Sequence, residues 1–174
     1  MSNNWIGKIS LLLVLGLTAV VIYNWSNKSK LAFINTKLVF EEFKLKKELA
    51  KKFENETAYT KRFLDSVGFN LQSRAKSLEL NKNAKQEEIA VFLDEKEIYL
   101  SRLEMFSKEK NQLSSKYDEQ ILKQMNQYIL DFGKENNYTY IFGSEGTGNI
   151  MYAKESEDIS KQIIEYINKK YDGK

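Results

Sequence analysis

The segment AFINTKLVFEEF, residues 32–43, changes character halfway along its length. Its first half has the pattern of a β-strand, whereas its second half spaces apolar residues three and four apart, as a helix does. The chain becomes strand-like again only at NNYTYIFGSEGTGNIMYA, residues 136–153. A long helical region therefore separates the first strand from the later ones, and the fold must explain how they meet.

Two helical arms, residues 36–80 and 87–132, are predicted to form an antiparallel coiled-coil hairpin. In both arms apolar residues recur at steps of three and four, the coiled-coil period. The polar stretch NKNAKQ, residues 81–86, supplies the tip, and each arm would span about 65 Å at helical rise. The first arm carries net charge +3 and the second −4, which favours their pairing. We expect Gly68 to mark a bend and Gly133 to end the second arm.

Each arm has its own predicted apolar seam. The first seam contains Val39, Phe43, Lys46, Ala50, Phe53, Thr57, Thr60, Leu64, Val67, Leu71, Arg74 and Leu78. The second contains Ile89, Leu93, Lys96, Leu100, Leu103, Phe106, Lys110, Leu113, Tyr117, Ile121, Met125, Tyr128 and Phe132. Eleven apolar residues fall off these seams: Phe40, Leu45, Tyr59, Phe63, Phe69, Phe92, Ile98, Tyr99, Met105, Leu122 and Ile129. The aromatic residues Tyr59, Phe69, Phe92 and Tyr99 are the candidates for binding another chain. They either broaden the seam or form an exposed apolar wall that grips another chain.

The rest of the chain predicts a small body of the α+β class, interrupted by the hairpin. Strands are expected at 31–35, 138–142 and 149–153, with a turn at 143–148, followed by a helix at 158–171 capped by Asp158. So small a sheet exposes its edges, and edge-to-edge joining of copies covers them. The body, residues 31–35 and 134–174, is therefore expected to form an oligomer through Ala32, Phe33, Ile34, Tyr140, Phe142, Ile150 and Tyr152.

The N-terminal region, residues 1–30, is expected to be a transmembrane anchor with a short linker. No charged residue occurs from Ile9 to Asn27, and a helix of that length spans the ~30 Å of a bilayer's hydrocarbon layer. Trp5, Tyr23 and Trp25 would then lie at the membrane interfaces. A cleaved secretory signal is the alternative, although the bulky residues after the apolar run do not resemble a cleavage site.

Composition excludes several functions. The chain has no cysteine and no histidine, so the usual zinc sites and Ser-His-Asp or cysteine nucleophiles are excluded. We expect no catalytic residue, no metal and no cofactor. Residues 31–174 carry 24 basic and 24 acidic side chains, which gives little support for nucleic-acid binding or a DNA-binding coiled coil.

The two ends of this region, LAFINTKLVFEEF and NNYTYIFGSEGTGNIMYAKESEDISKQIIEYIN, resemble the OmpH/Skp family of periplasmic chaperones. The resemblance covers about residues 31–170. It implies a homotrimer with a β-rich body and three helical tentacles that enclose unfolded outer-membrane proteins, without catalytic residues or a cofactor. Two features differ from the family pattern: the N-terminal segment is expected to stay as an anchor where family members have a cleaved signal, and residues 31–174 are neutral rather than basic.

Two functions follow as hypotheses. The first is an ATP-independent holdase in the periplasm, anchored to the inner membrane by residues 1–30 or soluble after signal cleavage. Its clients would be unfolded outer-membrane proteins, held by Tyr59, Phe69, Phe92 and Tyr99. The second is a membrane-tethered scaffold or adaptor whose hairpins dock into one folded envelope partner.

Overall fold

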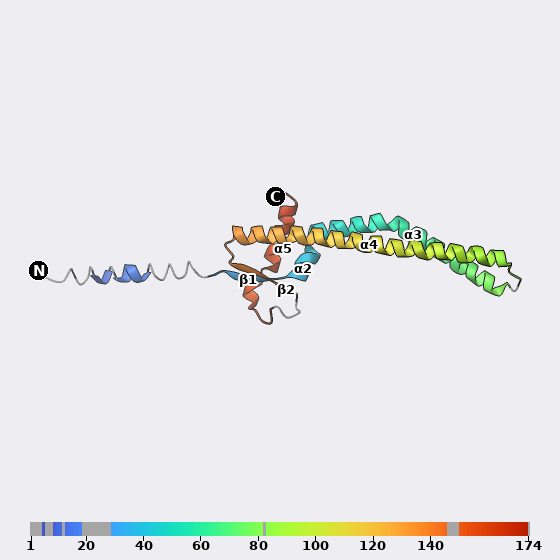
Figure 1. Cartoon of the computed structure of the whole chain (residues 1–174). Coiled ribbons are helices and arrows are strands. Elements are labelled where there is room, and N and C mark those ends of the chain that lie inside the picture. Colours follow the sequence, from blue (N-terminus) through green and yellow to red (C-terminus); the bar gives the residue numbers. More distant parts are fainter. Residues whose placement is uncertain are drawn as a thin grey trace.

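The computed structural model describes residues 5, 9–11, 13–18, 29–81, 83–145 and 150–173. A body of short elements lies at one end of a long helical hairpin, as Figure 1 shows. The elements, in chain order, are β1 (Leu31–Asn35), α2 (Thr36–Glu42), α3 (Lys44–Leu80), α4 (Gln86–Glu135), β2 (Tyr140–Ser144), the 3-10 turn η1 (Glu155–Glu157) and α5 (Ser160–Tyr171).

Strands β1 and β2 form a parallel pair that closes the hairpin onto the body. Their register runs from Leu31 opposite Tyr140 to Asn35 opposite Ser144. This confirms that the first strand pairs with a late one, although β2 begins two residues after the predicted start. Parallel strands need a long crossover connection, and here that connection is the whole hairpin.

The predicted strand at 149–153 is wrong for its described residues, 150–153, which lie in no strand; Asn149 lies outside the described residues. The free edge of β1 is instead occupied by the chain just before α5. Phe33 forms a parallel bridge with Asp158, and its carbonyl accepts a hydrogen bond of 3.0 Å from the Ile159 amide. With both edges of β1 occupied, residues 150–153 have no place beside β1.

The core of the body lies between the base of the hairpin and α5. Apolar residues at steps of four on α5 (Ile159, Ile163 and Ile167) are buried against α4 and α2. The other core residues are Ala32, Ile34, Val39, Phe43, Leu45, Leu49, Tyr117, Ile121, Met125 and Phe132. Asp158 is not the helix cap: Ile159 takes that position, and the Asp158 carboxylate accepts a 2.8 Å hydrogen bond from the Ser160 amide.

The hairpin agrees with the predicted arms apart from two local differences. Its tip matches, since α3 ends at Leu80 and α4 begins at Gln86. However, the first arm is broken at Phe43, which has extended backbone angles (φ −72°, ψ 127°). Gly133 does not end α4, which continues to Glu135. That predicted end failed because glycine only weakens a helix that tertiary packing supports. Gly68 lies inside the single helix α3, and the bend expected there stays a prediction.

The buried seam also shifts by one residue in two places. At the root of α3, Leu45 and Leu49 are buried, whereas the predicted Lys46 and Ala50 are not. The break at Phe43 and the packing of α5 turn this face of α3 toward the core.

On the distal part of α4 the inward positions belong to Phe92 and Tyr99, which are half-buried. Their neighbours Leu93 and Leu100, which the seam assigned inward, are 55% and 51% exposed. A seam counted at the coiled-coil period locates the inward face of a helix only to within about one residue. The reason is that a helix of about 3.6 residues per turn rotates gradually relative to a repeat of about 3.5.

At the N-terminus, residues 9–11 and 13–18 are helical. Within the described parts of the chain, no helix combines the length and the apolar character needed to cross a bilayer. Trp5 is described and is exposed, whereas Tyr23 and Trp25 lie outside the described residues. The anchor stays a prediction.

Candidate interaction surfaces

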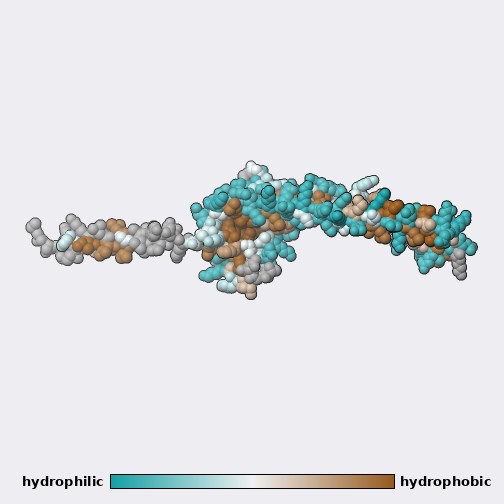
Figure 2. Space-filling view, viewed as in Figure 1, coloured by the Kyte–Doolittle hydropathy of each residue, from teal (hydrophilic) through white to brown (hydrophobic). Residues whose placement is uncertain are grey.

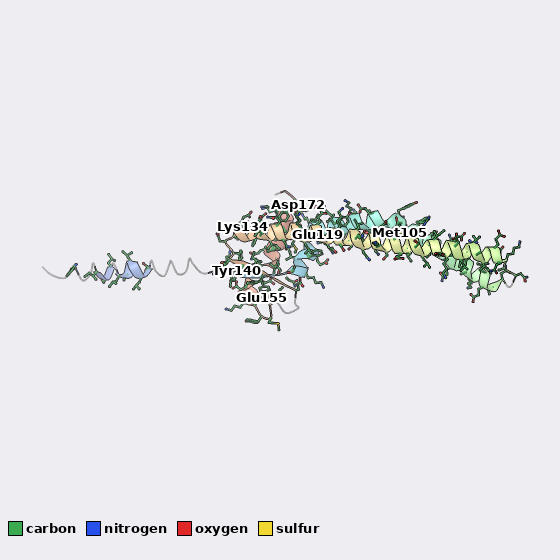
Figure 3. The ribbon with its side chains drawn as sticks, viewed as in Figure 1. Met105, Glu119, Lys134, Tyr140, Glu155 and Asp172 are labelled. Carbon is green, nitrogen blue, oxygen red and sulfur yellow. The ribbon has the colours of Figure 1, made fainter. Side chains whose placement is uncertain are left out.

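The body exposes a cluster of large apolar side chains, which we call the body patch: Leu31, Tyr140, Phe142, Met151 and Tyr152. Tyr140 and Phe142 lie on the same face of β2 because alternate residues of a strand point the same way. Their rings stack with centroids 5.8 Å apart. Met151 and Tyr152 are 89% and 84% exposed. Figure 3 shows Tyr140 on the body, near Lys134 at the base of α4 and far from the tip of the hairpin.

A hollow of about 620 Å³ lies beside the body patch, between the strands and residues 150–154. Five of the seven residues predicted for the oligomer contact line it: Ala32, Phe33, Phe142, Ile150 and Tyr152. The backbone edge of β2 that faces away from β1 pairs with nothing within the described residues. An apolar patch beside an open strand edge is a typical protein-protein contact.

Two of the predicted oligomer residues belong mainly to the core. Ala32 is 4% exposed and Ile34 is 3% exposed, and both pack in the buried cluster under the hairpin. The alternation of β1 explains this, because residues 32 and 34 share the face that packs into the buried cluster beside α5. Met151 was missed by the sequence prediction, although it stands next to Tyr152 in the same strand-like run.

The distal part of the hairpin, residues 59–105, exposes a second set of large apolar side chains. Figure 2 shows apolar residues along this part of the hairpin. The exposed side chains are Tyr59, Phe63, Phe69, Leu80, Val91, Leu93, Ile98, Leu100, Leu103 and Met105. We call this set the distal wall. Toward the root the same arms bury more of their apolar residues, including Leu49, Tyr117 and Met125, although Leu122 and Leu130 are exposed there.

A groove of about 290 Å³ opens in the distal wall between α3 and α4. Phe63, Val67 and Leu71 line it from α3, and Ile98 and Tyr99 from α4. Gly68 lets the two helices approach here, because a Cβ at this position would lie 2.6 Å from the Tyr99 hydroxyl oxygen. Tyr99, which lines the groove, therefore packs against a glycine on the opposite arm.

The four predicted client-binding residues separate into two pairs. Tyr59 and Phe69, 76% and 69% exposed, stand in the distal wall. Phe92 and Tyr99 are half-buried, and Tyr99 packs against Gly68. The sequence prediction missed Val91, whereas it already placed Ile98 and Met105 among the off-seam apolar residues; the spacing of seven along α4 that links the three was the available signal. Figure 3 shows Met105 farther from the body than Glu119.

Polar contacts fix the arms against each other at two levels. At mid-hairpin the Tyr117 hydroxyl donates a 2.8 Å hydrogen bond to Glu56, and burial together with this carboxylate raises the pKa of Tyr117. Farther out, Arg74 forms an ion pair with Glu95, the only ion pair between α3 and α4 within the described residues. The opposite net charges of the arms therefore meet in few direct pairs, and apolar contacts supply most of the association.

Comparison with known proteins gives two matches and one negative result. The family described as "Outer membrane protein (OmpH-like)" matches residues 30–167. Among solved structures, a crystal structure of an OmpH-like protein from Caulobacter crescentus CB15, reported as a candidate outer membrane chaperone, is similar with a TM-score of 0.66 at 13% identity. The similarity covers 82% of this chain and 86% of that one, and shows a shared fold. No curated protein matches.

Proposed function

The chain belongs to the OmpH-like family, in which chaperones of outer membrane proteins are found, and from this we propose that it is an ATP-independent holdase. Its clients would be unfolded outer-membrane proteins, bound in a cavity between the hairpins of a homotrimer. The observation that carries the proposal is the distal wall, because these side chains are exposed on a hairpin that is well packed at its root.

The distal wall suits a client without a fixed structure. Fully burying one large apolar side chain yields about 1.5–3 kcal/mol, so several partial contacts hold an unfolded chain while each remains weak. Contacts from several arms around one client reinforce one another through local concentration. Release then follows from competition by folding or insertion, and no nucleotide hydrolysis is required. Charge has a small part, since residues 31–174 are neutral overall.

The body patch supports the homotrimer. A two-stranded sheet is marginal by itself, and the outer edge of β2 has no partner within the described residues. Closing a ring of copies would cover both the edge and the body patch, because each patch meets the next copy's strands. Phe142 and Tyr152 stand at the hollow where such a contact would form.

The proposed location is the periplasm, with residues 1–30 as an inner-membrane anchor. Family membership supports the periplasm, and the uncharged run from Ile9 to Asn27 supports the anchor. The linker between this run and β1 is short, so the body would lie near the membrane surface. Signal cleavage, which would leave a soluble form, is the alternative, and the mass of the mature protein from the native membrane decides between them.

The full chain, reconstituted in lipid nanodiscs, provides the test. We would measure its oligomer mass by light scattering, alone and after addition of an unfolded outer-membrane barrel diluted from urea. Empty nanodiscs report direct insertion of the barrel into lipid. We expect three copies of the chain and one soluble client in the co-eluting complex.

Two variants separate the surfaces. Tyr59→Ser, in the distal wall, should weaken client retention and leave the trimer intact. Tyr152→Ser, in the body patch, should weaken the trimer first. A folded trimer that elutes alone while the client aggregates would refute the holdase proposal. A single folded protein recovered in stoichiometric amounts would then favour the scaffold or adaptor function.

A further inference from the structure

The break between α2 and α3 is not explained by the local sequence. The surrounding residues, LVFEEFKLKKEL (38–49), contain neither glycine nor proline and are compatible with one continuous helix. Nevertheless Phe43 has extended backbone angles, and its side chain is completely buried. Contacts from elsewhere in the fold must therefore hold the break open.

The aromatic packing around Phe43 supplies part of that support. Its ring meets the ring of Tyr128 on α4 edge-on, with centroids 6.2 Å apart, and the ring of Tyr171 on α5 in the same way at 5.7 Å. Such edge-to-face pairs add directional preference to burial. In a continuous helix the Phe43 side chain would move with the changed backbone and lose this site.

One side chain, Asn168 of α5, completes the backbone hydrogen bonds at both sides of the break. Its Oδ1 accepts a 2.8 Å hydrogen bond from the Lys44 amide, the first residue of α3. Its Nδ2 donates a 3.0 Å hydrogen bond to the Glu42 carbonyl, the last residue of α2. Helix ends leave these groups without intrahelical partners, so a single amide joins both helices to α5.

Neighbouring contacts concentrate on the same joint. Lys44 pairs with Asp172 at 2.5 Å, and the Tyr171 hydroxyl donates a 2.6 Å hydrogen bond to Glu48. Figure 3 shows Asp172 beside the root of the hairpin. The C-terminal end of α5 therefore contacts the first turns of α3 through several independent side chains.

Two further ion pairs cross the break itself: Glu41 with Lys46 at 2.5 Å and Glu42 with Lys47 at 2.6 Å. Both join residues five apart, whereas neighbours on a continuous helix are three or four apart. These pairs therefore favour the broken geometry over the continuous one.

We propose that Asn168 is a positioning residue that fixes the direction in which α3 leaves the body. This inference rests on the proposed function only in that α3 carries part of the distal wall, including Tyr59 and Phe69. Without the Asn168 amide, the free-energy difference between the broken and the continuous form of residues 36–49 becomes smaller. Helix α3 then leaves the body in a wider range of directions, while the direction of α4 stays the same. The alternative joint is a continuous helix, which the local sequence already allows.

The test measures two distances in the full chain in nanodiscs, without any client. Because the chain has no cysteine, spin labels can be placed by substitution alone. One pair, Glu54→Cys with Thr139→Cys, joins exposed sites on α3 and the body, and Ser101→Cys with Thr139→Cys joins α4 to the body. Labelled chains are diluted with unlabelled ones so that an oligomer contains one labelled copy.

In Asn168→Leu we expect the α3-to-body distance distribution to widen about twofold, while the α4-to-body distribution keeps its width. Asn168→Asp keeps the acceptor for Lys44 and should give an intermediate width. Lys161→Ala, at an exposed site on the first turn of α5, is the matched control and should change neither. Circular dichroism checks that each variant stays helical.

Unchanged α3 distances in both Asn168 variants would overturn the proposal. Equal widening of both distances would also overturn it, because that result means general loosening of the body. Since no client is present, these outcomes are independent of whether the holdase proposal holds.

Discussion

Replacing Gly68 with alanine tests whether the distal hairpin depends on close packing of Tyr99. An alanine Cβ would lie 2.6 Å from the Tyr99 hydroxyl oxygen and 3.1 Å from the adjoining ring carbon. The ring must move, and overpacking of this kind costs about 1–3 kcal/mol. Against this, alanine is favoured over glycine in a helix interior by about 1 kcal/mol. We expect a net loss of about 1 kcal/mol in the free energy of unfolding.

The same substitution should change sign once the ring is removed. In a Tyr99→Ala background nothing opposes the new methyl group, so Gly68→Ala should stabilise the chain by about 1 kcal/mol. The difference between the two backgrounds is a coupling free energy of about 2 kcal/mol, within the range for residues in direct contact. Ser66→Ala, at an exposed site two residues away, is the control and should show no coupling.

Urea unfolding followed by helical circular dichroism measures all four variants of this cycle. Protein concentration must be constant, because the stability of an oligomer depends on it. If Gly68→Ala stabilises the chain equally in both backgrounds, the glycine makes no essential contact. The role of Gly68 in forming the groove would then be refuted, and it would be only a weak point in α3.

Three other substitutions test the body and the hairpin. Ile163→Ala, at a completely buried site, should cost about 2–5 kcal/mol in thermal or urea unfolding, and the half-buried Ile164→Ala should cost less. The hydrogen bond to Glu48 raises the pKa of Tyr171 from 10.0 to about 12. The protonated Tyr171 hydroxyl therefore stabilises the folded chain fully below pH 10, and this contribution is lost as the pH rises through 12. The melting temperature should therefore fall less between pH 10 and pH 12 in Tyr171→Phe than in the unchanged chain. An equal fall in both would contradict this role of Tyr171. Arg74→Ala removes a partly exposed ion pair with α4 and should cost under about 1 kcal/mol, less in high salt, as urea unfolding would check.

The sequence predicted the architecture because its elements constrain one another. A lone strand at 31–35 needs a partner, and the later strand-like run could supply it only if the helical region folded back on itself. The tip at residues 81–86 followed from the polar break and from arms of equal length. These are global requirements of pairing, and they do not depend on the position of any single side chain.

The break at Phe43 could not be predicted in the same way. The contacts at the break come from distant segments, among them Asn168, which lies 124 residues from Lys44 in the chain, and no local breaker marks the site. Conversely, Gly133 carries a local signal for a helix end that the fold overrides. Local propensity is weak against burial and hydrogen bonding from distant segments, so element existence was predictable and this joint was not.

The candidate client surface was predicted only in part for a related reason. Heptad counting placed Leu93 and Leu100 inward and left Phe92 and Tyr99 off the seam. In the structure Phe92 and Tyr99 are half-buried, and Leu93 and Leu100 are exposed. A one-residue change in the inward line is small in angle but decides which side chains reach solvent. The useful signal was a glycine on one arm opposite an aromatic residue on the other, because that combination lets a large ring turn inward.

The strand prediction that failed, at residues 149–153, bears on the proposed trimer. Residues 150–153 have strand-like composition, yet in the single chain both edges of β1 are occupied, by β2 and by the segment around Asp158. An open backbone edge remains on β2 within the described residues, beside the exposed Phe142. Strand propensity depends on an available partner. A neighbouring copy would supply such a partner, so we expect residues 150–153 to gain amide-exchange protection only as the trimer forms, and to lose it in Tyr152→Ser at low protein concentration.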